Sequence, residues 1–148
     1  MTPKLRSILA TLALVVCMIV LIERGELFGR HPVGVALQVA AVALMIWARL
    51  TFGTRSFHAA ANPTEGGLVT TGPYRYWRHP IYAAILLFVW SGVLAQRHAP
   101  TWIALLLAAG ATLFTAVRIQ AEERLLYAAF PGYGDYAART KRLVPYLF

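Results

Sequence analysis

Charged residues are scarce in this sequence. Only 14% of its 148 residues carry a charge and 59% are hydrophobic, whereas an average soluble domain has about 25% charged and about 45–50% apolar residues. A soluble core of this size cannot enclose so much apolar surface. The composition therefore excludes an ordinary soluble domain and predicts lipid as the solvent. The length allows one domain, so we expect residues 1–148 to form a single integral membrane unit.

Cysteine is nearly absent, and familiar metal and nucleotide motifs are missing. Cys17 is the only cysteine, which excludes an intrachain disulfide and a cysteine-based metal site. The four histidines are scattered, at positions 31, 58, 79 and 98. The sequence contains no P-loop, dinucleotide glycine fingerprint or zinc motif. We therefore predict that the protein binds no metal.

Acidic residues are also few. Six Asp and Glu stand against 14 Lys and Arg, which gives a formal net charge of +8. A basic excess can attract nucleic acid, but here the basic residues lie between apolar runs rather than in one soluble patch. That distribution is typical of residues that orient membrane helices. We predict the lipid bilayer as the partner, and no nucleic acid.

Four apolar runs predict an all-α, polytopic membrane protein with about four transmembrane helices. A spanning helix needs about 17–25 residues, and each run is close to the lower limit. A segment that mixes charged and aromatic residues follows the last run. The predicted spans cover about residues 7–22, 33–52, 80–96 and 99–117, and the C-terminal segment covers residues 118–148.

Residues at the ends of the runs refine this prediction. The first run follows two basic residues, as in a signal peptide, but it ends in Glu23-Arg24-Gly25-Glu26 without a small-residue cleavage site, so we expect a retained anchor. Pro80 and Pro100 suit the first turns of the third and fourth helices, because the missing N–H of proline has no helical partner there. The short connection between these helices predicts an antiparallel hairpin. A fifth, broken or re-entrant span is the alternative.

The basic residues predict which side of the membrane each loop faces. With the N-terminus inside, eleven of the 14 basic residues lie inside, and Arg24, Arg30 and Arg97 lie outside. This asymmetry obeys the positive-inside rule. We therefore expect both termini, the loop before the third span and the C-terminal segment to be cytoplasmic.

A first candidate site lies at the start of the third span. A Gly72-Pro73 turn is followed by two arginines, one histidine and four aromatic residues within nine positions. A helix start also offers unpaired N–H groups and a positive dipole end, so the segment suits an anionic group and a flat ring. The alternative is an interfacial belt of aromatic and arginine residues. The nine positions read Tyr74-Arg75-Tyr76-Trp77-Arg78-His79-Pro80-Ile81-Tyr82.

A second candidate site follows the fourth span. Arg118 and Glu122 are spaced i,i+4 and share a helix face, and Glu123 follows directly. A surface ion pair of this kind contributes only about 0.3–0.5 kcal/mol. Acidic residues are rare in this chain, however, and ionisable groups at membrane depth are functional candidates by default.

A third group of residues recurs at three-residue steps in the C-terminal segment. A helix would place these residues along one side. We expect a tail that lies on the bilayer, with its arginines on lipid phosphates, or that closes over a pocket. The group consists of Tyr133, Tyr136, Arg139 and Arg142.

Two stretches of the C-terminal half carry specific motifs. They are LVTTGPYRYWRHPIY at residues 68–82 and EERLLYAAFPGYGDYAARTKRLVP at residues 122–145. Together they resemble the isoprenylcysteine carboxyl methyltransferase family and its relatives among the phospholipid methyltransferases. The RHPxY motif is short, but its place after a turn and before a span, with an acidic pair downstream, makes it specific. The resemblance covers about residues 66–145.

The resemblance implies a methyltransferase that uses S-adenosyl-L-methionine and acts on a lipophilic methyl acceptor. It implies an active site at the cytoplasmic membrane face, in a pocket formed by the loop before the third span and the C-terminal segment. It also implies that Glu122 binds the cofactor and that Arg118 binds the acceptor, and these two are the predicted catalytic residues. The cofactor-lining positions that it implies are Leu68, Val69, Tyr74, His79, Pro80, Ile81 and Tyr82.

These residue types suit the cofactor. A glutamate can accept from its ribose diol or its ammonium group, an arginine or a helix N-terminus can take its carboxylate, and aromatic rings can flank its adenine. Methyl transfer is an in-line displacement that mainly needs alignment of the nucleophile. A carboxylate acceptor needs no base, whereas an amine would need Glu122, Glu123 or His79 to accept its proton.

The chain departs from the family pattern at three places. Ala84 stands where a glycine usually follows the motif tyrosine by two residues. Pro131 separates Phe130 from the next glycine, and Ala59 stands where the family has a cofactor-contacting glutamine. These departures affect the predicted identity of the acceptor and the details of the pocket more than they affect the predicted cofactor.

Two other functions are open. An NADPH-dependent reductase of the sterol-reductase type has a related membrane architecture, and it would bind the 2′-phosphate through the arginines at positions 75, 78, 139 and 142. A non-enzymatic transporter or assembly factor would need polar residues near mid-membrane. There the spans offer little beyond Gln38, Ser91 and Thr112.

Overall fold

The computed structural model describes residues 2–53 and 67–143. Within these ranges the secondary structure is helical, with one isolated bridge between Trp77 and Lys141, which confirms the predicted all-α class. His58 and Ala59 lie outside the described residues. The helices are α1 (Pro3–Glu23), α2 (Pro32–Phe52), the 3-10 turn η2 (Gly72–Arg75), α3 (Pro80–Leu94), α4 (Trp102–Ala129) and α5 (Tyr133–Arg139).

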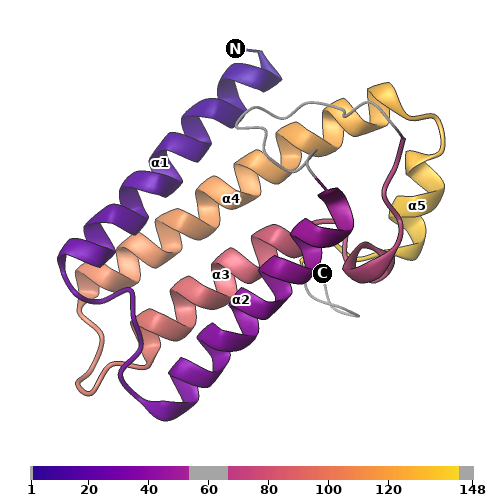
Figure 1. Cartoon of the computed structure of the whole chain (residues 1–148). Helices are drawn as coiled ribbons and strands as arrows, with labels where there is room; N and C mark the ends of the chain where they lie inside the picture. The colour runs from indigo at the N-terminus through magenta and orange to yellow at the C-terminus, as the bar shows by residue number, and fades with distance from the viewer. Residues whose placement is uncertain (1, 54–66, 144–148) are drawn as a thin grey trace.

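The four long helices form two pairs. α1 packs along α4 and α2 packs along α3, and α3 also contacts α4 as the predicted antiparallel hairpin (Figure 1). The α1–α2 and α3–α4 connections lie at one end of the bundle, while the N-terminus, η2 and α5 lie at the other. The chain thus runs along the bundle four times, as a four-span topology with both termini on one side requires.

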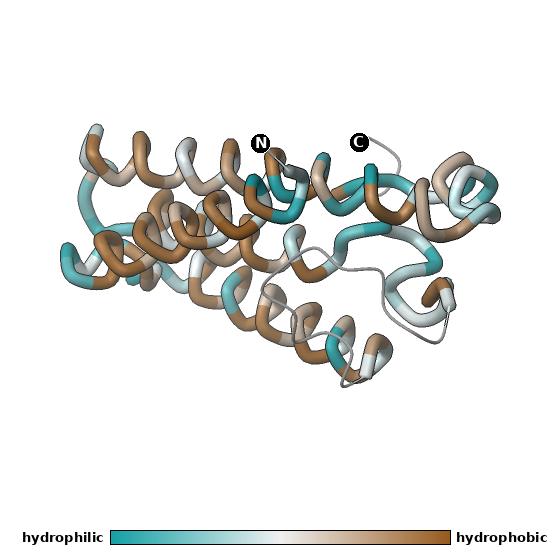
Figure 2. The backbone as a smooth tube through the Cα atoms, turned by 90° about the horizontal axis from the view of Figure 1, so that it is seen from above, coloured by the Kyte–Doolittle hydropathy of each residue, from teal (hydrophilic) through white to brown (hydrophobic). Residues whose placement is uncertain are grey.

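Three of the helices, α1, α2 and α4, are long and apolar enough to span a membrane. Figure 2 shows apolar residues along these helices and hydrophilic residues gathered toward the ends of the bundle. α3 has only 15 residues and is about 22 Å long at about 1.5 Å per residue, which is less than the hydrocarbon thickness of about 30 Å. It starts at Pro80 as predicted but ends two residues early, because the Ala95 carbonyl accepts from the backbone N–H groups of Arg30 (2.7 Å) and His31 (2.9 Å).

Helix α4 differs at both ends from the fourth predicted apolar run, residues 99–117. α4 starts at Trp102, after an N-cap at Thr101 whose side chain accepts from the N–H of Ala104, so Pro100 precedes the helix instead of occupying its first turn. It continues to Ala129, because residues 118–129 are mostly strong helix formers. It ends at Phe130, since a residue before proline disfavours the helical conformation.

Polar side chains within the spans are bonded to the protein itself. Gln38 Nε2 donates to the carbonyls of Leu27 (2.8 Å) and Phe88 (3.2 Å). Ser91 donates to the Phe88 carbonyl, and Thr112 accepts from the indole N–H of Trp90. These groups brace the helices, and the bonds satisfy polar atoms that lipid would leave without partners.

Backbone contact between the α1–α2 connection and α3 is unusually close at Gly92. A Cβ atom added there would lie 1.8 Å from the Leu27 carbonyl oxygen and 2.8 Å from Gln38 Nε2. Glu26, which is buried in the same connection, accepts from the Thr101 hydroxyl at 2.7 Å. This end of the bundle is therefore held by specific polar contacts and close packing.

The other end of the bundle is closed by the C-terminal segment. The Lys141 carbonyl accepts from Arg78 N (2.7 Å), and Lys141 N donates to the Tyr76 carbonyl (3.2 Å). Within α5, Tyr133 and Tyr136 are buried and Arg139 is exposed. Arg142 lies beyond the end of the helix. The segment thus packs against the turn before α3, which is the arrangement expected of a tail that closes over a site.

Candidate active site

The arginine and glutamate predicted after the fourth span meet a tyrosine of α3. Arg118 Nε lies 3.3 Å from Glu122 Oε1, so the predicted i,i+4 pair is present. The Tyr82 hydroxyl lies between them, where it accepts a hydrogen bond from Arg118 Nε and donates one to Glu122 Oε1. Arg118 Cζ also lies 5.6 Å from the centre of the Tyr82 ring, within cation–π distance. Tyr82 therefore fixes the arginine and the glutamate relative to each other.

The same arginine has a partner on α1. Arg118 Nη1 donates to Thr11 Oγ1, and the Thr11 hydroxyl donates to the Ser7 carbonyl at 2.8 Å. The Arg118 side chain is only 9% exposed, so its position is set by neighbours rather than by water. Three of the four long helices contribute to this cluster.

His79 lies between two carboxylates at the N-terminus of α3. Its Nδ1 is 3.7 Å from Glu122 Oε2, and its Nε2 is 3.5 Å from Glu123 Oε1. Its ring centre is 5.7 Å from that of Tyr82. Nε2 is buried and has no hydrogen-bond partner within the described part of the chain. Because the 3.5 Å separation from Glu123 is long for a hydrogen bond, the hydrogen-bonding capacity of this nitrogen is unused among the described residues.

The two adjacent glutamates have different surroundings. Glu123 accepts from Arg78 Nε at 2.9 Å and lies 3.0 Å from Arg142 Nη2. Its side chain is 9% exposed, whereas that of Glu122 is 21% exposed. Glu123 is therefore held in an ion-pair cluster, and Glu122 is the carboxylate of the pair that a ligand can reach.

Arg78 joins this cluster to the C-terminal segment. Besides Glu123, its guanidinium donates through Nη1 to the carbonyls of Ala137 (2.7 Å) and Thr140. A planar arginine fork can bind several acceptors in one fixed geometry. The end of α5 is thus tied to the residue before His79.

Two tyrosines complete the contact between the turn and α5. The Tyr136 hydroxyl donates to the Tyr74 carbonyl at 2.8 Å. Burial raises the pKa of Tyr136 to about 12, so its phenol remains a donor at neutral pH. Burial also raises the pKa of Tyr74, and neighbouring Tyr136 and Glu122 contribute less in the same direction, so this phenol too is neutral at neutral pH.

The remaining predicted cofactor residues lie in the first turn of α3 and in the stretch before η2. Pro80 is fully buried and occupies the first turn of α3 as predicted. Ile81 is half-buried beside it, and Leu68 and Val69 are half-buried in the stretch that leads into η2. The structure thus brings Arg118, Glu122, His79 and Tyr82 into one cluster, while cofactor binding by the predicted positions stays a prediction.

Sequence reasoning placed Arg78 and Glu123 in two separate candidate sites. Only the fold shows that they pair across 45 positions. Thr11 was missed altogether. The sequence feature that could have indicated Thr11 is the pair of hydroxyl residues Ser7 and Thr11, spaced i,i+4 in an otherwise apolar run.

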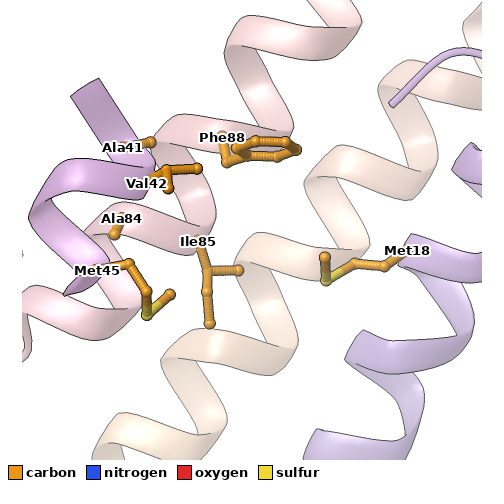
Figure 3. A pocket seen from close by; sticks show the side chains of 7 residues that line it. All are labelled: Met18, Ala41, Val42, Met45, Ala84, Ile85 and Phe88. Atoms are coloured by element: carbon orange, nitrogen blue, oxygen red, sulfur yellow. The ribbon is translucent and has the colours of Figure 1, made fainter. Parts of the chain in front are cut away.

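An apolar cavity of about 230 Å³ lies between α1 on one side and α2 and α3 on the other (Figure 3). Met18 faces it across from the other two helices, and Met45 and Phe88 project into it. Ala84, which replaces the family glycine, is two residues beyond Tyr82 on α3. The lining residues are Met18, Ala41, Val42, Met45, Ala84, Ile85 and Phe88.

Comparison with known families accounts for the motif around this cluster. Residues 33–128 match the isoprenylcysteine carboxyl methyltransferase (ICMT) family. The chain belongs to this family. The match covers α2, α3 and most of α4, and thus includes His79, Tyr82, Arg118 and Glu122. α1 and α5 lie outside the matched range.

Two curated relatives of this ICMT family member carry names from metal resistance. The cobalt-zinc-cadmium resistance protein CzcN of Cupriavidus metallidurans is 42% identical over 80 residues, which are 54% of this chain and 36% of that protein. The nickel-cobalt-cadmium resistance protein NccN of Alcaligenes xylosoxydans xylosoxydans is 41% identical over 80 residues, which are 54% and 37%. The chain thus spans little more than a third of the length of either relative. No solved structure matches it significantly.

The residues present fit S-adenosylmethionine. The site offers a reachable carboxylate at Glu122 and, at His79 Nε2, a buried ring nitrogen without a hydrogen bond among the described residues. These two groups complement an ammonium or diol and a polar heteroatom, which the cofactor carries. Among the described residues, no group of three or more histidine, cysteine, aspartate and glutamate side chains is arranged to hold a metal ion.

Proposed function

We propose that this ICMT family member transfers a methyl group from S-adenosylmethionine to a lipophilic, membrane-associated acceptor. The observation that carries the proposal is the contact of Arg118, Tyr82, Glu122 and His79 at the start of α3, within the family match. When bound, the cofactor supplies an electrophilic methyl group on its sulfonium. The residues of the chain then have to hold the cofactor and align the acceptor, which is catalysis by positioning.

Glu122 is the proposed cofactor carboxylate. It is the more exposed of the two adjacent glutamates, and Tyr82 and His79 orient it from α3. Glu123 is already neutralised by Arg78 and Arg142, which leaves it a structural role. We propose that Tyr74, Pro80 and the neighbouring positions line the same pocket.

Arg118 is the proposed acceptor residue, and the acceptor arrives from the bilayer. Arg118 is one turn before Glu122 on α4, and the apolar cavity between α1 and α3 begins within one turn of Tyr82. An apolar chain gains free energy by moving along apolar side chains rather than through water. We propose that the site, like both termini, faces the cytoplasm, from which the cofactor is supplied.

The alternatives have less support. Two of the four arginines proposed for an NADPH 2′-phosphate, Arg78 and Arg142, are paired with Glu123. The mid-membrane residues on which a transporter would depend, Gln38, Ser91 and Thr112, make hydrogen bonds within the protein. Neither function uses the contact between Tyr82 and Glu122.

Calorimetry on the protein purified in detergent tests the proposal. S-adenosylhomocysteine, the product form of the cofactor, should bind, and NADPH should not. Glu122→Ala should weaken S-adenosylhomocysteine binding at least tenfold, while Glu23→Ala, the same change at an exposed position on α1, should leave it unchanged. Arg118→Ala should spare binding and reduce methyl transfer. Normal binding to Glu122→Ala would overturn the site, and no binding to the folded wild-type protein would overturn the function.

A further inference from the structure

The first helix contacts the proposed site through the hydroxyl group of Thr11. α1 lies outside residues 33–128, so the family match says nothing about what α1 contributes. The helix is apolar from Ile8 to Ile22 except for Thr11 and Cys17. The Thr11 hydroxyl accepts a hydrogen bond from Arg118.

The donors and acceptors at Thr11 are ordered. Its hydroxyl proton is used on the Ser7 carbonyl at 2.8 Å, one turn earlier in α1. Its oxygen lone pairs are therefore turned outward, where Arg118 Nη1 donates to them. A hydroxyl whose proton is committed in this way acts as an oriented acceptor.

Arg118 is consequently held from two helices other than its own. Tyr82 of α3 accepts from Nε, and Thr11 of α1 accepts from Nη1. A planar guanidinium with two of its nitrogens fixed cannot rotate about its terminal bonds. Without Thr11, the ion pair with Glu122 and the bond to Tyr82 would remain, and the outer part of the guanidinium would lose its acceptor on α1.

We infer that Thr11 is a positioning residue, which orients the Arg118 guanidinium toward the methyl acceptor. The inference rests on the proposed function for its effect on catalysis, and on the structure alone for its effect on Arg118. A positioned arginine is required for alignment of the acceptor, whereas cofactor binding depends on Glu122. Loss of the hydroxyl should therefore affect the acceptor and spare the cofactor.

The test compares Thr11→Val, which removes the hydroxyl at nearly constant volume, with Thr11→Ser, which keeps it. Thr112→Val is the matched control. The Thr112 hydroxyl likewise donates to a carbonyl one turn earlier, that of Ala108 (2.9 Å), and accepts from a neighbouring helix, through Trp90 Nε1 (3.0 Å). It has the same kind of hydrogen-bonding pattern but lies outside the Arg118 cluster.

The first readout needs no substrate. The Nη–H signal of Arg118, assigned by its loss in Arg118→Lys, is recorded by nitrogen-15 NMR in detergent micelles, because Nη1 is the nitrogen that donates to Thr11. Thr11→Val should shift this signal and speed its hydrogen exchange at least fivefold, while Thr11→Ser and Thr112→Val should leave it unchanged. An unchanged signal in Thr11→Val would overturn the inference, whatever the enzyme assays show.

The second readout uses N-acetyl-S-farnesylcysteine, a lipophilic carboxylate, as the methyl acceptor. Thr11→Val should lower kcat/KM for it at least fivefold and keep the Kd for S-adenosylhomocysteine within twofold, and Thr11→Ser should restore the rate. Unchanged turnover with a shifted Arg118 signal would overturn the catalytic role. If the wild type neither binds S-adenosylhomocysteine nor methylates this acceptor, the proposed function fails, while a shifted signal still supports Thr11 as the residue that positions Arg118.

Discussion

The Tyr82 hydroxyl donates its proton to Glu122, a residue 40 positions later in the chain and on a different helix. It does so while it accepts from Arg118, so one phenol is hydrogen-bonded to both the proposed acceptor residue and the proposed cofactor residue. The ion pair of α4 is thereby connected to the start of α3, where the RHPxY motif ends.

Removal of this hydroxyl tests the connection. In Tyr82→Phe the ring remains beneath Arg118, and the direct contact between Arg118 and Glu122 at 3.3 Å remains. We expect the free energy of unfolding to fall by about 1–2 kcal/mol, as for a lost hydrogen bond to charged groups, and S-adenosylhomocysteine affinity to fall several-fold. Calorimetry and thermal unfolding in detergent measure both. Tyr127→Phe, at an exposed tyrosine of α4, is the control, and equal behaviour of the two variants would contradict the prediction.

Arg78 should determine how firmly the C-terminal segment is held. Arg78→Lys keeps the positive charge near Glu123, but an ammonium cannot bond in the fixed fork geometry to the carbonyls of Ala137 and Thr140 as well. We expect amide hydrogen exchange in residues 137–142 to become at least tenfold faster. Hydrogen-exchange mass spectrometry measures this, and Arg75→Lys, an exposed arginine in the same turn, should show no change. Unaltered exchange in Arg78→Lys would show that the backbone contacts alone hold the segment.

The close contact at Gly92 should tolerate no side chain. In Gly92→Ala the new Cβ would lie 1.8 Å from the Leu27 carbonyl oxygen, so the backbone of the α1–α2 connection has to move. We expect destabilisation by about 3 kcal/mol, seen as a lower unfolding temperature. Gly110→Ala is the matched control, because the nearest atom to its Cβ would be 3.6 Å away, an ordinary contact. A wild-type unfolding temperature in Gly92→Ala would show that the two segments are not in contact.

Glu26 should make stability depend on acidity. The hydrogen bond from the Thr101 hydroxyl lowers the pKa of this buried carboxyl most, and the hydrogen bond and charge of Arg24 lower it further. A carboxyl with a lower pKa in the folded state stabilises the protein above its unfolded pKa of about 4.3, and this contribution is lost as the pH falls through the folded pKa. Glu26→Gln should therefore unfold at a lower temperature than wild type at pH 7, and the difference should shrink below about pH 4. A constant difference between pH 7 and pH 3 would contradict this assignment.

The helical class and the starts of α2 and α3 could be predicted because hydrophobic runs and helix-start prolines are local signals. The length of α4 could not be read from hydropathy. Residues 118–129 are polar but strong helix formers, so the helix continues after the apolar run ends and carries Arg118, Glu122 and Glu123 with it. Helix propensity decides this boundary, and hydrophobicity does not.

The residues that surround Arg118 could likewise be predicted only in part. Arg118 and Glu122 were predictable as a pair because their spacing alone places them on one face of a helix. Thr11 and Tyr82 come from other helices, and their contacts with Arg118 depend on how α1 and α3 pack against α4. No spacing within one segment encodes such contacts, and a single hydroxyl in an apolar run gives a weak signal.

The shortness of α3 affects which measure of concentration would govern the reaction of a lipid-soluble substrate. Its 15 residues begin at the end of the bundle that carries His79 and Tyr82. A helix of about 22 Å in a hydrocarbon layer of about 30 Å draws its first turn below the headgroups or thins the leaflet around it. A molecule dissolved in that leaflet would meet Tyr82 without first returning to water. Saturation would then follow its mole fraction among the surrounding lipids, so dilution with inert lipid should lower the rate even when its amount per volume of suspension stays constant.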